Sequence, residues 1–477
     1  MIRLVTDRFT VDDLANLTKE QARELYQAGE ESVVWALLQL SAMARERADA
    51  AGTDDPATPS AMIPPYKKPA KKKRGKKPGR KAGHEGRRRP APEQVNERVK
   101  HVADRCPDCG GPVSPMDTAP RSRVIEDIEA TRAKATKHVI HSHYCPNCRK
   151  RVEPRVLDAL PRATIGNRTV ALTSWLHYGL GNTVSQVVEV LNRLFHFPIS
   201  PGGLTQMWTR AGKVLSPWYD QIAAEAIVSA VLHADETGWR VNGKAHWLWC
   251  FTNPSLTYYI IDESRGSDVL TEFFGEQFGG TLVSDFFSAY NAFDPQSRQT
   301  CLVHLLREIK KVSQTDGSDE WLMFSRGLKR IIKDAMRLGV RADRDAPDYK
   351  SKRARIEQRL DELCVGVYEN PAAKRLIKRL RKHREHLFVF LLDPAVAPDN
   401  NRAEREIRPA VITRKNSFHN MSEGGARTQS ILMSVYRTLK LRGHDPVETI
   451  ADAMAVHIAG GKLPALPRAR EQNARDP

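Results

Sequence analysis

Residues 231–239 read Val-Leu-His-Ala-Asp-Glu-Thr-Gly-Trp, an apolar run that ends around Asp235. Residues 280–290, Gly-Thr-Leu-Val-Ser-Asp-Phe-Phe-Ser-Ala-Tyr, repeat this arrangement around Asp285. Short apolar runs of this kind predict buried strands, so we expect each aspartate where a strand ends. A single aspartate in that place is usually a turn residue or a helix cap, whereas two in matching contexts favour a shared site.

The sequence around the two aspartates predicts a mixed α/β sheet. Three consecutive strands are followed by a helix over about residues 267–278, after which strand and helix alternate, as is typical of such a sheet. In a ribonuclease-H-like arrangement the first and fourth strands are neighbours, so the two carboxylates can share a metal ion. The expected strands cover residues 230–237, 245–252, 257–262, 281–286 and 299–303.

A third carboxylate, Glu404, follows within Asn-Asn-Arg-Ala-Glu-Arg-Glu-Ile-Arg-Pro, residues 400–409, where we expect a helix. Mg²⁺ prefers hard oxygen ligands, and two such ions can activate both ends of an in-line phosphoryl displacement. We therefore expect Asp235, Asp285 and Glu404 to be catalytic and to hold two Mg²⁺ ions, which Mn²⁺ can replace.

Two nearby glutamates compete for a place in this site. Glu236 follows Asp235 directly, but alternate residues of a strand point to opposite faces, so it is the weaker ligand candidate. Glu406 lies about 200° from Glu404 around a helix, and only one of the two can face the aspartates.

The chain is strongly basic, with 477 residues, a net charge of +18 and a pI of about 9.6. Thirteen Lys and Arg residues against a single Glu lie between Lys67 and Arg89. Clustered charge of this kind favours a polyanionic partner, and Arg and Lys between Gly and Pro can lie in a DNA minor groove. The alternative for residues 51–97, a disordered linker by composition, is a solubilising tether.

Further cations lie close to Glu404 in the sequence. Others lie in residues 159–225, which have the outline of a helix-turn-helix motif. That outline consists of a helix over 183–195, a turn over 196–200, and a second helix capped by Ser200. Together with the basic linker, these regions supply the candidate DNA contacts, which are Lys71, Lys72, Lys73, Arg74, Lys76, Lys77, Arg80, Lys81, Arg87, Arg88, Arg89, Arg210, Arg405, Arg408, Arg414 and Lys415.

Four of the seven cysteines form two Cys-x-x-Cys pairs, which are Cys106 with Cys109 and Cys145 with Cys148. This spacing is typical of one structural Zn²⁺ held by four thiolates, whereas a redox dithiol would need only one pair. We expect a zinc ribbon over residues 98–158, with strands that include 123–128. Another motif, Cys301-Leu-Val-His304, has no second pair and is expected in the second shell of the catalytic site.

The remaining chain divides by composition. Residues 1–50 are expected to form helix, either a short coiled coil that pairs two subunits or a helix packed on its own domain. The catalytic core is expected in two parts, 226–310 and 395–445, around an all-helical insertion over 311–394. Residues 446–477 should form a last helix and a tail that is loose beyond about 460. No signal peptide or membrane span is evident, which favours a cytoplasmic, nucleoid-associated protein.

Together these motifs resemble the large, TnpC-type transposase of the IS66 family of bacterial insertion sequences. The matching residues are Asp-Glu-Thr-Gly-Trp with Trp-Leu-Trp after it, Ser-Asp-Phe-Phe-Ser-Ala-Tyr, Cys-x-x-His and Asn-Asn-x-Ala-Glu-Arg-x-Ile-Arg-Pro. The zinc-ribbon cysteines and Pro-Gly-Arg-Lys-x-Gly-His also match, so the likeness covers about residues 65–450. Any one motif is weak, but six in this order are specific.

The resemblance implies a DDE transposase with a ribonuclease-H-like core, in which Asp235, Asp285 and Glu404 form the triad. It also implies binding to double-stranded DNA at the terminal inverted repeats and at the target, action as a dimer or higher oligomer, and small accessory proteins of the same element. Two alternatives stay open, a non-catalytic, domesticated DNA-binding protein and a structure-selective nuclease of the same fold.

Overall fold

The computed structural model describes residues 19–30, 32–34, 36–41, 92, 94–102, 104–114, 123–126, 128, 131–417 and 419–470. The basic candidates from Lys71 to Arg89 lie outside these residues. The chain divides into two units, residues 1–58 with 133–477 and residues 59–132, and each is described by itself. Among the described helices, none is long and apolar enough to cross a membrane.

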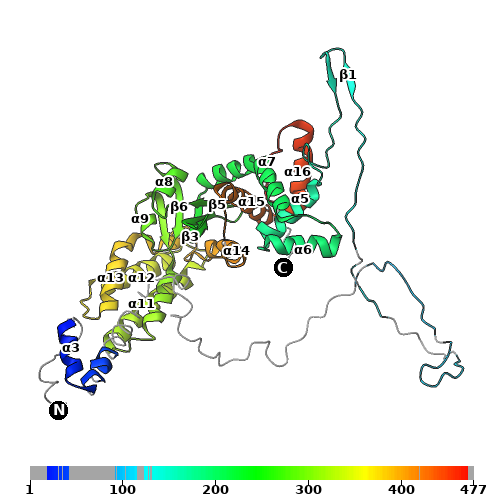
Figure 1. Ribbon diagram of the computed structural model, residues 1–477. Helices are drawn as coiled ribbons and strands as arrows, with labels where there is room; N and C mark the ends of the chain where they lie inside the picture. The colour runs from blue at the N-terminus through cyan, green and yellow to red at the C-terminus, as the bar shows by residue number, and fades with distance from the viewer. Residues whose placement is uncertain are drawn as a thin grey trace. The chain divides into compact units, whose positions relative to one another are not determined.

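The larger unit is built on a five-stranded sheet with the order β5-β4-β3-β6-β7 (Figure 1). β4 runs antiparallel to both β3 and β5, whereas β6 runs parallel to β3 and β7 parallel to β6. The first and fourth expected strands are therefore neighbours, as predicted. The strands are β3 (Val231–Val241), β4 (Lys244–Thr252), β5 (Thr257–Asp262), β6 (Phe278–Ser284) and β7 (Pro295–Thr300).

The expected position of Asp235 at the end of a strand is wrong. β3 continues to Val241 because its second half pairs with β4 through a tight turn at Asn242 and Gly243, both with positive φ. Asp235 therefore lies in the middle of an eleven-residue strand. Asp285 follows β6 directly, as expected.

Helices cover both faces of the sheet. On one face α8 (Asp268–Phe274) stacks Phe273 on Phe251 and Tyr258, and the short α9 (Ser288–Asn291) follows β6. On the other face lie α14 (Asn401–Ser417) and α15 (Glu423–Leu441). Their contact with the sheet includes Tyr259, whose amide donates to Ser434 Oγ at 2.9 Å.

The helical region before the sheet agrees closely with its sequence signals. Thr183 and Gln186 form a capping box at the start of α6 (Val184–Phe195), and Ser200 caps α7 (Pro201–Ile227). α7 ends close to the expected end of the helical region at residue 225, and Trp218 and Ile222 are buried in its second half. α5 (Asn167–Ser174) and a π-helical turn, η2 (Trp175–Gly179), precede α6.

The expected all-helical insertion follows β7. Its apolar core contains Trp321, Phe324 and Leu328 and joins the sheet through Val283 of β6. Asn370 caps α13 through two backbone amides, as its Asn-Pro sequence predicts. The insertion and its approach comprise α10 (Leu302–Val312), α11 (Asp319–Gly339), α12 (Pro347–Val365), α13 (Pro371–Lys382), η3 (Arg384–His386) and η4 (Val389–Leu391).

The expectation of a loose tail beyond residue 460 is wrong for the described residues up to 470. After α16 (Pro446–Gly460) the chain returns along α7, where Trp218 Nε1 donates to the Pro464 carbonyl at 2.6 Å. Leu466 is buried there, and Arg442 donates to the Pro467 carbonyl. The apolar positions of the tail therefore belong to the core.

The cysteine region contains little regular structure, whereas the described N-terminal residues are mainly helical. β1 (His143–Cys145) and β2 (Lys150–Val152) form a hairpin around the second cysteine pair. The expected strand over 123–128 is wrong for 123–126, which have no regular structure. α3 (Lys19–Gln27) is helical as predicted, and Leu37 in the next helical stretch is 60% exposed.

α14 is fixed to the sheet unit by a buried ion pair. Glu406 is 7% exposed and accepts from Arg437 of α15 at 2.6 and 2.8 Å. Truncating one partner of such a pair leaves the other charge buried and unpaired, which typically costs about 3–5 kcal/mol.

We predict that Glu406→Ala lowers the free energy of unfolding by about 3–5 kcal/mol, because Arg437 loses its counter-ion. Chemical denaturation measures the change, with Glu272→Ala as the control because Glu272 lies on the exposed side of α8. Equal stabilities of the two variants would contradict the anchoring role of the pair.

Candidate active site

Strand register brings the two aspartates level with each other. The parallel ladder between β3 and β6 pairs His233 with Val283 and ends there. Asp235 and Asp285 each lie two residues beyond that last pair, so they stand opposite each other just past the end of the ladder. Backbone amides orient both carboxylates, Glu236 N to Asp235 at 3.0 Å and Phe287 N to Asp285 at 2.8 Å.

Both aspartates carry raised pKa values. Burial is the main cause for Asp235, followed by the charges of Glu236 and Asp285, and together they hold its pKa well above the usual range. Burial also raises the pKa of Asp285. Within the part of the chain that the structure describes, neither carboxylate forms an ion pair. The described residues therefore give the two carboxylates no direct counter-ion, and their raised pKa values mean that their ionised forms are disfavoured there.

Asn400 places the helix that carries the third carboxylate. Its side-chain amide donates to the Ala234 carbonyl at 2.7 Å, and its Oδ1 accepts from His233 Nδ1 at 3.1 Å. Its backbone amide donates to Cys301 Sγ at 3.2 Å. Since Glu404 N bonds back to the Asn400 carbonyl, the first turn of α14 starts directly beside Asp235 on β3.

Glu404 lies in that first turn and is held by Arg307 of α10. Both of its oxygens accept from the guanidinium, at 2.7 and 3.0 Å. Partial burial raises the pKa of Glu404, but the hydrogen bonds and charge of Arg307, aided by His304 and Arg408, outweigh burial and lower it. The charge of Glu404 also contributes to the raised pKa of both aspartates, so the three carboxylates interact.

The two competing glutamates have partners of their own. Glu406 points into the core to Arg437, which leaves Glu404 as the residue of α14 near the aspartates. Glu236 faces the α8 side of the sheet, where Arg265 Nη2 and the Tyr290 hydroxyl each donate to it at 2.8 Å. The sequence argument from alternating strand faces therefore agrees with the structure.

Arg265 was not identified from the sequence. Its guanidinium lies over the rings of Trp247, at 4.3 Å, and Phe287, at 3.9 Å, while it pairs with Glu236. Its charge also acts on Asp285 and opposes the rise in that pKa. Arg265 comes from the loop after β5. The aromatic residues Trp247 and Phe287, which its guanidinium contacts, were the only sequence signal for its position.

Cys301 and His304 lie beside Glu404. One ligand atom from each of these three residues lies within 4.8 Å of the others, and no other such group of three occurs among the described residues. Burial raises the pKa of Cys301 to about 11, and burial lowers the pKa of His304. At neutral pH both are therefore uncharged in the absence of a metal ion.

The candidate DNA contacts of the described residues differ in their surroundings. Arg405, Arg408 and Lys415 are exposed on α14. Arg414 instead donates to Thr237 Oγ1 at 2.9 Å and to the Gly238 carbonyl, so it ties α14 to β3. Arg210 is exposed, but its guanidinium donates to the Pro161 carbonyl at 2.7 Å.

Each cysteine pair forms a similar turn within its own unit. Gly110 follows the first pair with a φ of 72°, and Arg149 follows the second with a φ of 51°. Backbone hydrogen bonds from Cys109 and Cys148 are the main cause of the lowered pKa values of Cys106 and Cys145, respectively. A lowered pKa favours the thiolate, which is the form that binds metal.

Comparison with known proteins identifies the family. Three proteins of Sinorhizobium fredii (strain NBRC 101917 / NGR234), each described as uncharacterized, are similar to the chain. y4qI is 30% identical over 45% of this chain and 44% of its own length, and y4jD is 25% identical over 54% and 56%. The chain thus spans about half the length of these two curated relatives, whereas y4hP is 22% identical over 77% of this chain and 73% of its own length.

The profile of the transposase IS66 family matches residues 162–428. This stretch is more than half of the chain, and it contains the sheet, the three carboxylates and the whole helical insertion. The chain belongs to the transposase IS66 family.

Proposed function

We propose that this transposase cuts and joins DNA by metal-dependent phosphoryl transfer, with Asp235, Asp285 and Glu404 as the catalytic triad. The observation that carries the proposal is the pair of partly buried aspartates that stand level with each other and have no ion-pair partner among the described residues. Glu404 supplies a third interacting carboxylate from α14. Membership of the family supports DNA as the substrate.

We also assign the core to the ribonuclease-H-like fold. Three antiparallel strands followed by two parallel ones, with the first strand in the middle of the sheet, support this assignment. The helical insertion enters after β7 and returns to α14 before Glu404. Such a core places its acidic residues at the carboxyl end of the parallel strands.

The donor set fits Mg²⁺. It offers carboxylate oxygens, which are hard ligands, and a buried excess of negative charge that a divalent cation would neutralise. Asp235, Asp285 and Glu404 would hold two ions, for which Mn²⁺ could substitute. When bound, the ions would supply activation of the attacking oxygen and stabilisation of the leaving 3′-oxygen.

The protein residues then have distinct tasks. Asp235 and Asp285 would bind the metal ions. Backbone amides orient their carboxylates, so the oxygens are in place before metal arrives. Arg307 keeps Glu404 ionised and near the aspartates. The exposed cations of α14, Arg405, Arg408 and Lys415, hold DNA phosphates beside the site, since guanidinium groups match phosphate geometry.

The remaining assignments follow from the sequence and the family. We propose one structural Zn²⁺ held by the two cysteine pairs, supported by their spacing and by the matching turn in each pair. The basic segment from Lys71 to Arg89 and the α6–α7 region would bind the terminal inverted repeats. A dimer or higher oligomer on paired ends and small accessory proteins of the element complete the proposal.

The first prediction concerns metal and stability. Because the folded-state pKa of Asp235 lies above its unfolded value, ionising it as pH rises through that range lowers stability. Asp235→Asn should therefore raise the melting temperature of metal-free protein at pH 7, and the gain should vanish at a pH that protonates Asp235 in both states. Mg²⁺ at about 100 times its dissociation constant should stabilise the unsubstituted protein by roughly 2.7 kcal/mol, and the variant by much less.

Thermal denaturation with and without Mg²⁺ measures both effects. Asp452→Asn is the matched control, because Asp452 is exposed on α16. An equal Mg²⁺ response in Asp235→Asn and the control would remove Asp235 from the metal site.

The second prediction concerns chemistry. Glu404→Gln should lower Mg²⁺-dependent cleavage of a duplex carrying an element end by more than about 100-fold, the upper range for residues that only support a metal ligand. DNA affinity should remain. A gel assay of cleavage and of joining to target DNA, beside Glu272→Gln, gives the readout. Full cleavage by Glu404→Gln would disprove the triad, and cleavage without joining would favour a nuclease.

The third prediction concerns zinc. Elemental analysis of purified protein should give one zinc per chain, and Cys145→Ser should lose it because three thiolates remain for a four-coordinate ion. Cys364→Ser, a substitution in the insertion core, should retain the metal. Zinc content unchanged by Cys145→Ser would refute the four-cysteine site.

A further inference from the structure

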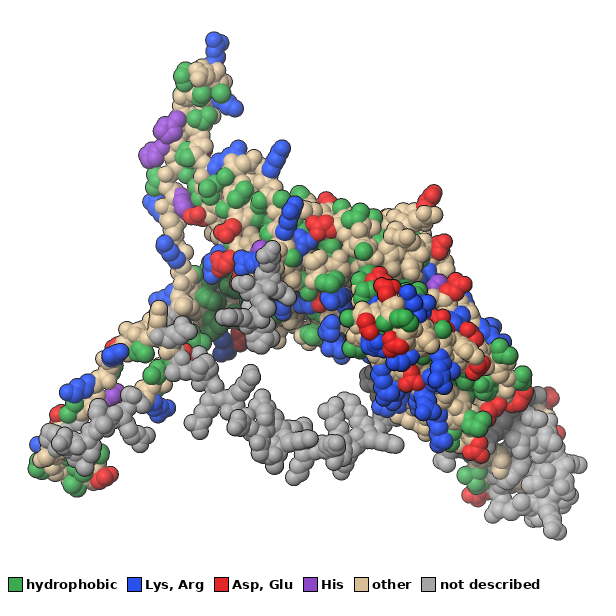
Figure 2. All heavy atoms as spheres, turned by 180° about the vertical axis from the view of Figure 1, so that it is seen from behind, with side chains coloured by type: hydrophobic (Ala, Val, Ile, Leu, Met, Phe, Trp, Pro, Cys, Tyr) green, Lys and Arg blue, Asp and Glu red, His purple; other side chains and the backbone are tan. Residues whose placement is uncertain are grey.

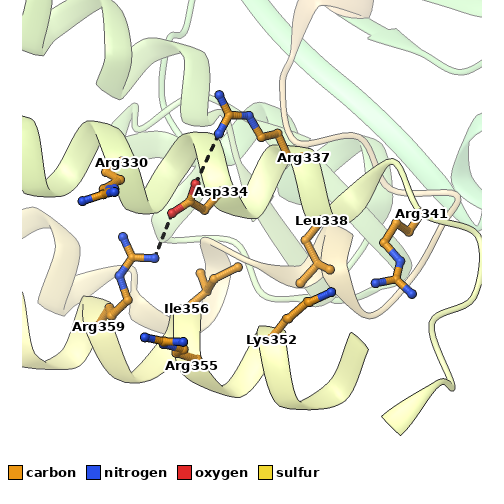
Figure 3. Close-up of a pocket in the computed structure, with 9 residues that line it drawn as sticks. All are labelled: Arg330, Asp334, Arg337, Leu338, Arg341, Lys352, Arg355, Ile356 and Arg359. Atoms are coloured by element: carbon orange, nitrogen blue, oxygen red, sulfur yellow. Dashed lines mark hydrogen bonds and ion pairs between the residues drawn. The ribbon is translucent and has the colours of Figure 1, made fainter. Parts of the chain in front are cut away.

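A basic groove runs between α11 and α12 of the helical insertion, and none of its lining residues belongs to the candidate active site. Its volume is about 580 Å³. Figure 3 shows Asp334 linked to both Arg337 and Arg359, with Leu338 and Ile356 between the two helices. The lining includes one carboxylate, Asp334, and six cations, which are Arg330, Arg337, Arg341, Lys352, Arg355 and Arg359.

The cations form two facing rows. Arg330 and Arg337 lie seven residues apart on one side of α11, and Arg341 follows the end of that helix at Gly339. Lys352, Arg355 and Arg359 follow at intervals of three and four on α12. From Arg330 to Arg337, and from Lys352 to Arg359, each helix advances about 10 Å at 1.5 Å per residue, so each row is an extended line of charge.

The charge of the groove is only partly balanced. Asp334 is shared between Arg359, at 2.9 Å, and Arg337, at 3.5 Å. Arg341 pairs with two aspartates at the α11–α12 turn, one of which also binds Lys352 at 3.1 Å. Three carboxylates thus serve four cations in this groove.

Arg330 and Arg355 are the exceptions. Both are exposed, and neither forms an ion pair or a hydrogen bond with any residue that the structure describes. In the view of Figure 2, Lys and Arg side chains gather on the insertion. These two guanidinium groups are therefore available to an external anion.

The groove rests on a packed floor. Leu338 of α11 and Ile356 of α12 line it and are about 95% buried in the insertion core. Both helices pack on that shared core, which supports the two rows of cations. An apolar floor between rows of cations suits a chain in which phosphates alternate with sugar rings.

We propose that the α11–α12 groove binds the phosphate backbone of DNA, as a contact surface of the insertion separate from the carboxylate site. The extended rows fit a linear polyanion better than a single small anion, and arginine forms paired hydrogen bonds to phosphate oxygens. This inference rests on the proposed action on DNA, and it gives the insertion a part in holding that substrate.

The test is the salt dependence of DNA binding by the full-length protein. Affinity for a fluorescent 30-base-pair duplex is measured by anisotropy across a series of KCl concentrations, without divalent metal. Each phosphate contact contributes about 0.9 to the slope of log affinity against log salt. Arg330→Gln with Arg355→Gln should flatten the slope by about 1.8, whereas Arg330→Lys with Arg355→Lys should keep most of it.

The matched control removes two charges from another face of the insertion. Lys378 and Lys382 are exposed on α13 and do not line the groove, so Lys378→Gln with Lys382→Gln should leave the slope unchanged. Two outcomes would refute DNA binding by the groove but leave the proposed function intact. One is an equal effect of both Gln pairs, and the other is an effect of neither pair while the parent protein binds DNA. Failure of the parent protein to bind any duplex would overturn the groove together with the proposed function.

Discussion

The hydrogen bonds of Asn400 are the constraint on which the site depends. One buried side chain holds the Ala234 carbonyl and His233 on β3, while its backbone amide meets Cys301 at the end of β7. Burial lowers the pKa of His233 to about 4, so this ring is neutral and can keep a fixed donor toward the amide. The start of α14 is thereby set against the sheet, and Glu404 follows from it.

The carboxylates around Asn400 differ in whether an arginine pairs with them. Glu404 and Glu236 each have an arginine, and Glu406 has a third in the core. Among the described residues, Asp235 and Asp285 accept hydrogen bonds only from the backbone amides of Glu236 and Phe287. Because each surrounding glutamate pairs with an arginine, the two aspartates are the carboxylates left to be neutralised. A divalent cation could neutralise them.

The sequence predicted those parts that depend on local signals. The bounds of β5, the helix over residues 183–195 and the Ser200 cap of α7 follow from periodicity and capping residues. The length of β3 was missed because its second half is stabilised by pairing with β4, which an apolar run does not record. Arg265, Arg307 and Asn400 were missed because their partners come from distant elements, although Asn400 belongs to the quoted Asn-Asn motif.

The insertion begins and ends at almost the same point. Leu302 N bonds to the Pro398 carbonyl at 3.0 Å, and Asn400 N meets Cys301 Sγ. The entropy of closing such an excursion rises only slowly with its length, so its outer helices can lengthen or shorten while the hydrogen bond between Asn400 and Cys301 stays closed. The helices that share an apolar core with Val283 of β6 lack that freedom, because a change there would disturb the strand that leads into Asp285.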